Sequence, residues 1–405
     1  MAIDAGLNFT ADFLNLRSIR QTLPQAFEGW YEPKQYRKSQ DYLKINTLFG
    51  WIINAFDLIV ILLFWFGGGF AWLDDRVRDL NWPIMWSGLI YIGALLATKA
   101  LLAMPFDMYA TFVIEERFGF NQTTWKIYVK DRIKSLALAM ILGVPLLAAV
   151  LVFFQYAGSN AWWICWLATV SFMFLVQYIA PAWIMPLFNR FDPLAEGELR
   201  NAIMDYARRI DFKLDNIFVM DGSKRSSKSN AFFTGFGQHR RIVLFDTLIA
   251  RHSVDELVAV LAHEMGHYKE KHMLKNLLIG ILQAGIMFYI LSFFISYKGL
   301  FQAFYVNHVT VYAGLIFFGM LYAPLDGLMG IAVQALSRRH EYAADRFAVR
   351  TGGEKNAMIE ALKKLSVHNL SNLQPHPFYV LLNYSHPPVL KRIEAIENYL
   401  VSIQK

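Results

Sequence analysis

Residues 253–272 read SVDELVAVLAHEMGHYKEKH, and the rest of the chain is organised around this stretch. Ser253 and Glu256 have the spacing of a capping box, which starts a helix. Leu257, Val260 and Leu261 then place apolar side chains at helical spacing. We therefore expect one continuous helix over 253–272.

The expected helix carries the pattern His-Glu-x-x-His at residues 263–267. Residues four apart lie on one helix face, so His263 and His267 can bind a single metal ion. Glu264 lies one position round the helix, beside the metal, where it can take a proton from metal-bound water. A helix without a metal site could also carry two surface histidines at this spacing. A pattern of three fixed residues, however, rarely arises by chance, which favours the metal site.

The composition is that of a membrane protein. Of the 405 residues, 56% are hydrophobic and 18% are charged, with a mean hydropathy of +0.32. The net charge of +7 falls mainly in loops between apolar runs, which favours a lipid bilayer as partner and argues against nucleic acid. Cys165 is the single cysteine, so any metal must be bound by His and carboxylate side chains.

Six apolar segments reach the roughly 20 residues that a helix needs to cross a bilayer. They lie at about 46–73, 84–114, 135–157, 160–187, 274–297 and 309–336. The sequence therefore predicts an all-α membrane protein with about six transmembrane helices.

A small α+β lobe is expected between the fourth and fifth spans. The pattern over 198–210 predicts an amphipathic helix, and 216–220, 231–234 and 241–245 predict three short strands. A turn containing Gly235 and Gly237 would join the last two strands. The lobe therefore leads directly into the His-Glu-x-x-His helix.

The basic residues predict the orientation in the membrane. The N-terminal segment has a basic patch of Lys34, Arg37, Lys38 and Lys44, and the 115–134 loop has five basic residues. Six spans put these segments, the α+β lobe and the C-terminal region on one side. That side is cytoplasmic by the positive-inside rule.

Four ionisable residues lie within the predicted spans: Asp57, Lys99, Asp107 and Asp326. Such groups are costly in lipid unless they face other helices or water. Each could make an interhelical hydrogen bond, but four in one chain favour a polar chamber enclosed by the helices.

A catalytic zinc needs a third protein ligand, and Glu341 is the best candidate. His272 points off the ligand face, His252 lies three turns away, and Glu270 is one turn too far along. Glu341 would start a new helix beyond the last span. Asp345 shares its face and could accept the N–H of a ligand histidine. From spacing alone, an ordinary solvated helix is equally well supported.

These residues together resemble the integral-membrane zinc CAAX prenyl proteases. Besides the zinc motif and Glu341 to Asp345, three further segments match that family over roughly residues 15–400. They are Glu115 to Asn121 with Thr123 or Thr124, Ser229 to Phe236, and Ser385 to Pro388 with Arg392. HtpX-like proteases share the zinc motif but are shorter.

The resemblance implies roles for residues that spacing alone leaves unassigned. Asn230, Ala231, Phe232 and Phe233 would form a sheet edge that pairs with an extended substrate, with the Asn230 side chain holding a substrate carbonyl. His386 would donate a hydrogen bond to the oxyanion, with support from Arg392. The helices would enclose a water-filled chamber with zinc at its cytoplasmic end.

The chain departs from the family pattern at two places. Family members begin with another spanning helix before the Asn15 region, where this chain has only fourteen residues that are not apolar. Either this lineage has six spans or the start has been trimmed. Phe232 and Thr234 stand where Tyr is expected in eukaryotic members, which could alter substrate fit.

We therefore expect a membrane-embedded zinc metalloendopeptidase that binds one Zn²⁺. Its substrate would be a protein or peptide, and the family reaction removes the last three residues of a prenylated Cys-aliphatic-aliphatic-any terminus. A bacterial quality-control protease for membrane proteins without a prenyl requirement is one alternative, and an inactive scaffold or transporter-like protein is another. The membrane would be the bacterial cytoplasmic membrane or the endoplasmic reticulum, depending on the organism.

Five segments are expected along the chain. They are a cytoplasmic N-terminal segment (1–44), four transmembrane helices (45–187), the α+β lobe with substrate strand and zinc helix (188–273), two transmembrane helices (274–336), and a C-terminal helical lobe with the third zinc ligand and catalytic His (337–405).

Overall fold

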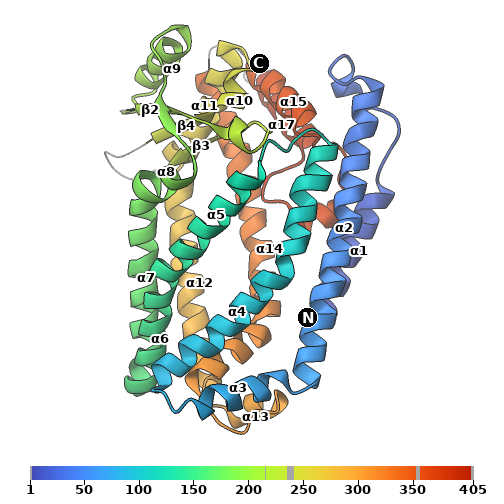
Figure 1. Ribbon diagram of the computed structural model, residues 1–405. Coiled ribbons are helices and arrows are strands. Elements are labelled where there is room, and N and C mark those ends of the chain that lie inside the picture. The colour runs from blue at the N-terminus through green and yellow to red at the C-terminus, as the bar shows by residue number, and fades with distance from the viewer. Residues whose placement is uncertain (1, 215, 235–240, 353–355, 403–405) are drawn as a thin grey trace.

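A computed structural model describes residues 2–214, 216–234, 241–352 and 356–402. Within these ranges, six long apolar helices stand side by side (Figure 1). They span Pro33–Phe66 (α2), Ile84–Glu115, Trp125–Tyr156, Gly158–Phe188, His272–Phe294 (α12) and Val311–Thr351 (α14). The second span begins with α4 (Ile84–Tyr109), and the third contains α5 (Trp125–Leu138) and α6 (Val144–Tyr156). The fourth contains α7 (Ala161–Ile179) and α8 (Met185–Phe188). The predicted all-α membrane fold with about six spans is confirmed.

A small lobe lies at one end of the long helices. Its sheet has the order β1-β2-β4-β3, where β2 and β4 are parallel and the outer pairs are antiparallel. The strands are Phe191–Pro193 (β1), Asn216–Met220 (β2), Ala231–Thr234 (β3) and Arg241–Phe245 (β4). The three predicted strands are confirmed, β1 adds a fourth, and the turn predicted at Gly235 and Gly237 lies outside the described residues.

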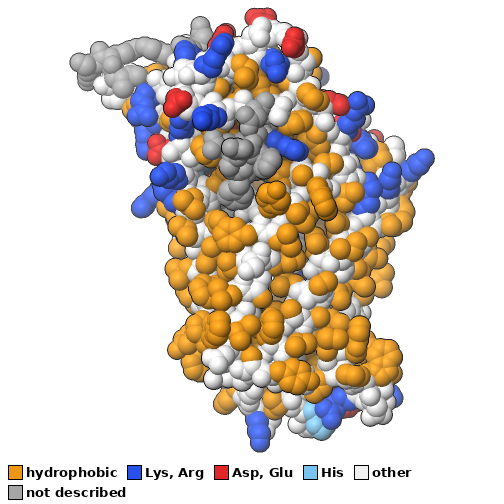
Figure 2. All heavy atoms as spheres, turned by 90° about the vertical axis from the view of Figure 1, so that its left-hand side faces the viewer, with side chains coloured by type: hydrophobic (Ala, Val, Ile, Leu, Met, Phe, Trp, Pro, Cys, Tyr) orange, Lys and Arg blue, Asp and Glu red, His pale blue; other side chains and the backbone are white. Residues whose placement is uncertain are grey.

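Short helices complete the two ends of the molecule. At the lobe end lie α9 (Glu198–Arg209), α10 (Asp246–Ile249), α11 (Val254–Lys269), α15 (Ala357–His368), α16 (Pro377–Asn383) and α17 (Val389–Ser402). At the opposite end lie α3 (Gly69–Asp79) and α13 (Lys298–Ala303), as Figure 1 shows. Figure 2 shows hydrophobic side chains covering the face between the two ends, while Lys and Arg gather at the ends.

The spanning helices are packed loosely against one another. In the most apolar stretch of each helix, no more than 17% of the residues are buried. Each helix therefore contacts its neighbours through few side chains, and most of its residues are at least partly exposed. Asp57, Lys99 and Asp326 are accordingly exposed, whereas Asp107 pairs with Arg132 of the next span. This arrangement is consistent with a polar chamber between the helices.

The expected single helix over 253–272 is wrong in its second half. The capping box forms, since Ser253 Oγ accepts from the Glu256 N–H (3.3 Å) and Glu256 accepts from the Ser253 N–H (3.0 Å). However, α11 ends at Lys269, and Lys271 has a left-handed φ of +57° before α12 begins at His272. The break lets the chain turn from the lobe into the membrane, and no Gly or Pro marks it in the sequence.

The first predicted span ends early, at Phe66 instead of near residue 73, because Gly68 adopts a left-handed φ of +75° before α3 begins. Two other predicted helix ends are wrong because the helix continues past the apolar segment. The first span begins at Pro33 rather than near residue 46, and the last continues unbroken to Thr351 instead of ending near 336. The polar residues at these ends are good helix formers without an interrupting Gly or Pro, so the helices run on beyond the apolar segment. Glu341 therefore lies on the last span itself and not on a separate helix.

The N-terminal residues form a helix that the apolar pattern does not predict. Helix α1 (Ala2–Arg17) packs against α2 and α16. Its buried Asn15 accepts hydrogen bonds from the His376 backbone N–H (3.0 Å) and the Asn372 side chain (3.2 Å). The two ends of the chain are thereby joined beside the lobe.

Candidate active site

The centre of the lobe is a contact between α11 and α14 that brings His263, His267 and Glu341 together. The Nε2 atoms of the two histidines are 3.1 Å apart. Glu341 Oε2 lies 3.4 Å from His263 Nε2, and Oε1 lies 3.2 Å from His267 Nε2. Both His263 and Glu341 are buried, so the three groups meet in a site largely shielded from water.

The two helices can approach this closely because small residues face each other. A Cβ added to Gly266 would lie 3.2 Å from Ala344 Cα and 3.2 Å from Phe347 Cβ. Ala344 is fully buried at this crossing. Gly266 supplies the matching space on α11.

His263 is held by a second acidic residue behind the first contact. Its Nδ1 lies 2.9 Å from Asp345 Oδ1, and Arg392 of α17 binds both Asp345 oxygens, at 2.8 and 2.5 Å. Burial alone would lower the pKa of His263, but the nearby carboxylates of Asp345 and Glu341 outweigh it and raise that pKa to about 9. A metal that binds here must therefore displace a proton.

His267 is held by a partner that the sequence did not predict. Its Nδ1 lies 3.1 Å from His272 Nδ1, and the buried His272 ring stacks on His340 with centroids 4.0 Å apart. The break at Lys271 turns His272 back toward α11, which is why five-residue spacing along one helix placed it off the ligand face. When His267 binds through Nε2, its Nδ1–H can donate to His272, which then accepts as a neutral ring.

Replacing His272 with Leu is expected to weaken metal binding about tenfold or more, because His267 loses its acceptor. His272→Asn, whose side-chain oxygen can accept the same hydrogen bond, should recover most of the affinity. Competition with a chromogenic chelator measures both variants, and thermal unfolding checks that they fold. Equal affinity in wild type and His272→Leu would contradict this role.

Glu264 follows the first histidine and lies beside the three clustered groups. Burial raises the pKa of Glu264, although the neighbouring His263 and His267 oppose this effect. A raised pKa makes the carboxylate a stronger base and brings it nearer the pH at which an enzyme works. Among the described residues, Glu264 makes no hydrogen bond that would occupy its carboxylate.

His386 approaches the same centre from the loop before α17. Its Nε2 lies 3.3 Å from Glu341 Oε1, and 63% of its side chain is exposed, so it can reach a bound molecule. Ser385 Oγ lies 2.9 Å from its Nδ1. If the Ser385 hydroxyl donates, the ring proton stays on Nε2, which faces the centre. Arg392 Nη1 lies 3.6 Å from Glu341 Oε2, deeper in the site.

Strand β3 forms one edge of the sheet and packs beside α11. Phe245 N–H donates to Asn230 O (3.1 Å), so Ala231 and Phe233 turn their backbone groups away from β4, toward the side of β3 that pairs with no other strand of the described residues. Asn230 is exposed, and its Oδ1 accepts from the Ala231 N–H (2.9 Å). Its side-chain NH₂ is therefore available to a ligand, whereas Phe233 packs against Tyr268 of α11.

The three clustered groups fit a metal ion. The Nε2 atoms of His263 and His267 lie 3.1 Å apart, so with both rings neutral their lone pairs can face a single cation. Within the described chain, buried Glu341 Oε2 has no hydrogen-bond partner, and the three donor atoms lie within 4.8 Å of one another. Two His and one carboxylate with an open fourth position are a ligand set of catalytic metal sites.

A His-Glu-x-x-His helix, a carboxylate on a second helix and six membrane spans define a membrane-embedded metallopeptidase. The comparisons with known proteins agree with this class. Residues 193–400 match the model of peptidase family M48, and residues 12–190 match the N-terminal domain of CAAX prenyl proteases. The chain belongs to peptidase family M48 and to its CAAX prenyl protease branch. That N-terminal model has five membrane helices, while the described residues within it contain four long apolar ones.

The relatives are similar over nearly the whole chain. CAAX prenyl protease 1 of Saccharomyces cerevisiae is 33% identical over 93% of this chain and 88% of its own length. The Arabidopsis thaliana homologue is 34% identical over 95% of this chain and 93% of its own length. The crystal structure of S. mikatae Ste24p superposes with a TM-score of 0.92 at 31% identity, covering 98% of this chain and 97% of that one.

Proposed function

We propose that the chain is a zinc metalloendopeptidase that removes the C-terminal tripeptide from prenylated proteins. The observation that carries the proposal is the convergence of His263, His267 and Glu341 next to Glu264 at the end of a membrane bundle. The names of the similar proteins, which are CAAX prenyl proteases, support the substrate class.

The proposed metal ligands are His263, His267 and Glu341, with Asp345 supporting His263. Zinc suits this set of two imidazoles and one carboxylate, and when bound it supplies a Lewis acid that polarises a carbonyl and activates water. Asp345 and His272 each hold one ligand ring at Nδ1, at 2.9 and 3.1 Å, so both rings are oriented in advance.

Glu264 is the proposed general base and then general acid. It would take the proton of the attacking water and pass it to the leaving amine. His386 Nε2–H would donate to the oxyanion that develops on the scissile carbonyl. Because Arg392 binds Asp345 with two nitrogens, we assign it mainly to holding Asp345 and His263, with Nη1 lending positive charge to the oxyanion region.

The edge of β3 is the proposed seat of the substrate backbone. The Ala231 carbonyl and the Phe233 backbone groups would pair with an added strand, the Asn230 NH₂ could hold a substrate carbonyl, and Phe232 lies between Ala231 and Phe233. Main-chain pairing of this kind accepts many side chains, while the chamber between the spans would receive the apolar prenyl group.

We further propose that the lobe faces the cytoplasm. The basic loops lie at the lobe end, which supports this orientation, and either a bacterial cytoplasmic membrane or the endoplasmic reticulum would meet it. We also propose the division of the chain into the five segments expected from the sequence. Two of its boundaries fall inside helices, because α2 runs across residues 44 and 45 and α14 runs across residues 336 and 337.

A farnesylated peptide ending in a Cys-aliphatic-aliphatic-any motif is expected to be cleaved at least about tenfold more efficiently than its unprenylated twin. Burying only part of the farnesyl chain would supply this difference in kcat/KM. The assay uses the purified protein in phosphatidylcholine nanodiscs, with release of the tripeptide followed by mass spectrometry. Equal efficiency for both peptides would overturn the prenyl requirement and favour a quality-control protease.

A further inference from the structure

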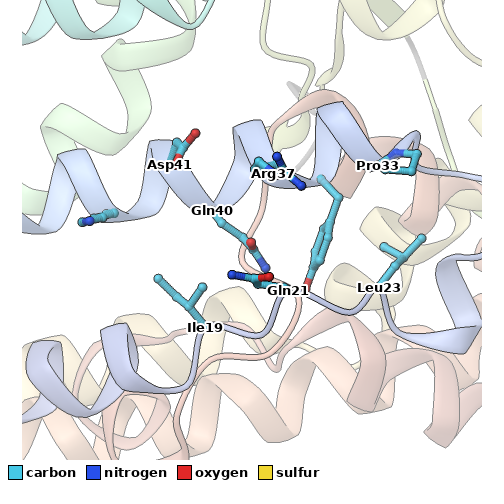
Figure 3. A pocket seen from close by; sticks show the side chains of 9 residues that line it. Ile19, Gln21, Leu23, Pro33, Arg37, Gln40 and Asp41 are labelled. Atoms are coloured by element: carbon cyan, nitrogen blue, oxygen red, sulfur yellow. The ribbon is translucent and has the colours of Figure 1, made fainter.

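A cavity on the N-terminal side of α2 is not part of the active site. It has a volume of about 480 Å³ and lies between α2 and the segment that follows α1 (Figure 3). Gln21 and Gln40 point toward each other across it, and Ile19 and Leu23 form its apolar wall. Arg37, Lys44, Asp41, Tyr36 and Pro33 complete the lining.

The charged residues in the cavity lining are two cations, Arg37 and Lys44, and one carboxylate, Asp41. In the described part of the chain, no salt bridge is made by Arg37 or Lys44, nor by Lys34, Lys38 or Arg20 nearby. Asp41 is exposed, and Figure 3 shows its carboxylate turned away from Gln21. Arg37 and Lys44 of the basic patch predicted from the sequence thus form an electropositive site. This site has no role in the proposed peptidase mechanism.

The cavity also lies at the level expected of lipid headgroups. Its lining residues on α2, from Pro33 to Lys44, immediately precede the apolar part of the same helix, which crosses the membrane. Tyr36 and Gln40 are held in place because both donate to the Arg20 carbonyl. Clusters of Lys and Arg beside a spanning helix are typical binding sites for anionic phospholipids.

We propose that this cavity binds the phosphate-bearing headgroup of an anionic phospholipid. Arg37 and Lys44 would pair with the phosphate, and the amides of Gln21 and Gln40 would bind hydroxyl groups of the headgroup. Ile19 and Leu23 would contact the glycerol and the first acyl carbons. A soluble phosphate has the same charge but no acyl chain, so it would leave this apolar wall uncovered.

The test titrates the delipidated full chain, in neutral detergent, with short-chain phosphatidylglycerol or with phosphatidylcholine of the same chain length. Native mass spectrometry measures the Kd for each lipid. We expect phosphatidylglycerol to bind about tenfold more tightly. Arg37→Gln with Lys44→Gln should remove this preference, and Ile19→Glu should weaken phosphatidylglycerol binding by adding a carboxylate to the opposite wall.

Lys126→Gln with Lys130→Gln is the matched control, because it removes two exposed charges from another helix, α5, at the same end. The control should keep the wild-type preference. Equal loss in both double variants would mean diffuse surface attraction and would overturn the site. Displacement of the lipid by an equal concentration of inorganic phosphate would assign the site to the free anion and overturn the lipid proposal.

Discussion

Replacing Glu264 with Gln is expected to lower peptide cleavage by about 10³-fold while the metal stays bound. Glutamine has the shape of glutamate but cannot take a proton from water. Glu264 is not one of the three groups that converge on the metal position, so its loss should not release the metal. Cleavage of a fluorogenic peptide and metal content by emission spectroscopy measure the two effects separately.

Glu270→Gln provides the control for Glu264. It removes a carboxylate at the exposed end of the same helix and should cleave at the wild-type rate. If Glu264→Gln cleaves as fast as wild type, the proposed base is wrong. If it loses its metal, the residue is part of the binding site rather than the proton carrier.

Replacing Glu341 with Gln is expected to weaken metal binding by more than about 100-fold. Loss of an outer partner costs about 10–100-fold in affinity, and loss of a ligand should cost more. Glu341 also lies within 3.6 Å of His263, His267, His386 and Arg392, so its negative charge balances the whole cluster. Chelator competition at fixed pH gives the affinity, and cleavage should fall with metal content.

Asp345→Asn gives the graded comparison for Glu341. It keeps all three proposed ligands and changes only the group behind His263, so its affinity should fall between wild type and Glu341→Gln. Equal affinities for Asp345→Asn and Glu341→Gln would mean that Glu341 contributes charge alone and is not a ligand.

The sequence predicted the parts of this molecule that depend on local patterns. Apolar length predicted the spans, alternation predicted three strands, and the capping box predicted where α11 begins. It also predicted that His263, His267 and Glu341 belong together, although spacing alone left Glu341 undecided and the family resemblance was needed to choose it.

Of the features that the sequence analysis missed, the helix break depends on tertiary contacts, whereas the longer helices depend on helix propensity. The break at Lys271 has no Gly or Pro, and it is stabilised by the packing of His272 against His267 and His340. The outward extension of α2 and α14 follows from helix propensity, which apolar windows ignore. The left-handed conformation of Lys271, which places His272 beside His267, cannot be read from the sequence and is visible only in the three-dimensional structure.

Helix α14 connects the membrane to the lobe as one continuous helix, and its internal proline, Pro324, lies in the membrane part, 17 residues before Glu341. Its 41 residues extend about 60 Å at 1.5 Å per residue, so a tilt of ~5° would shift its far end by ~5 Å. Gly266 touches Ala344 on this helix, three residues beyond Glu341, and α11 must travel with it. When bilayer thickness changes, the lobe should therefore swing as one rigid body, while the distances among His263, His267 and Glu341 are preserved.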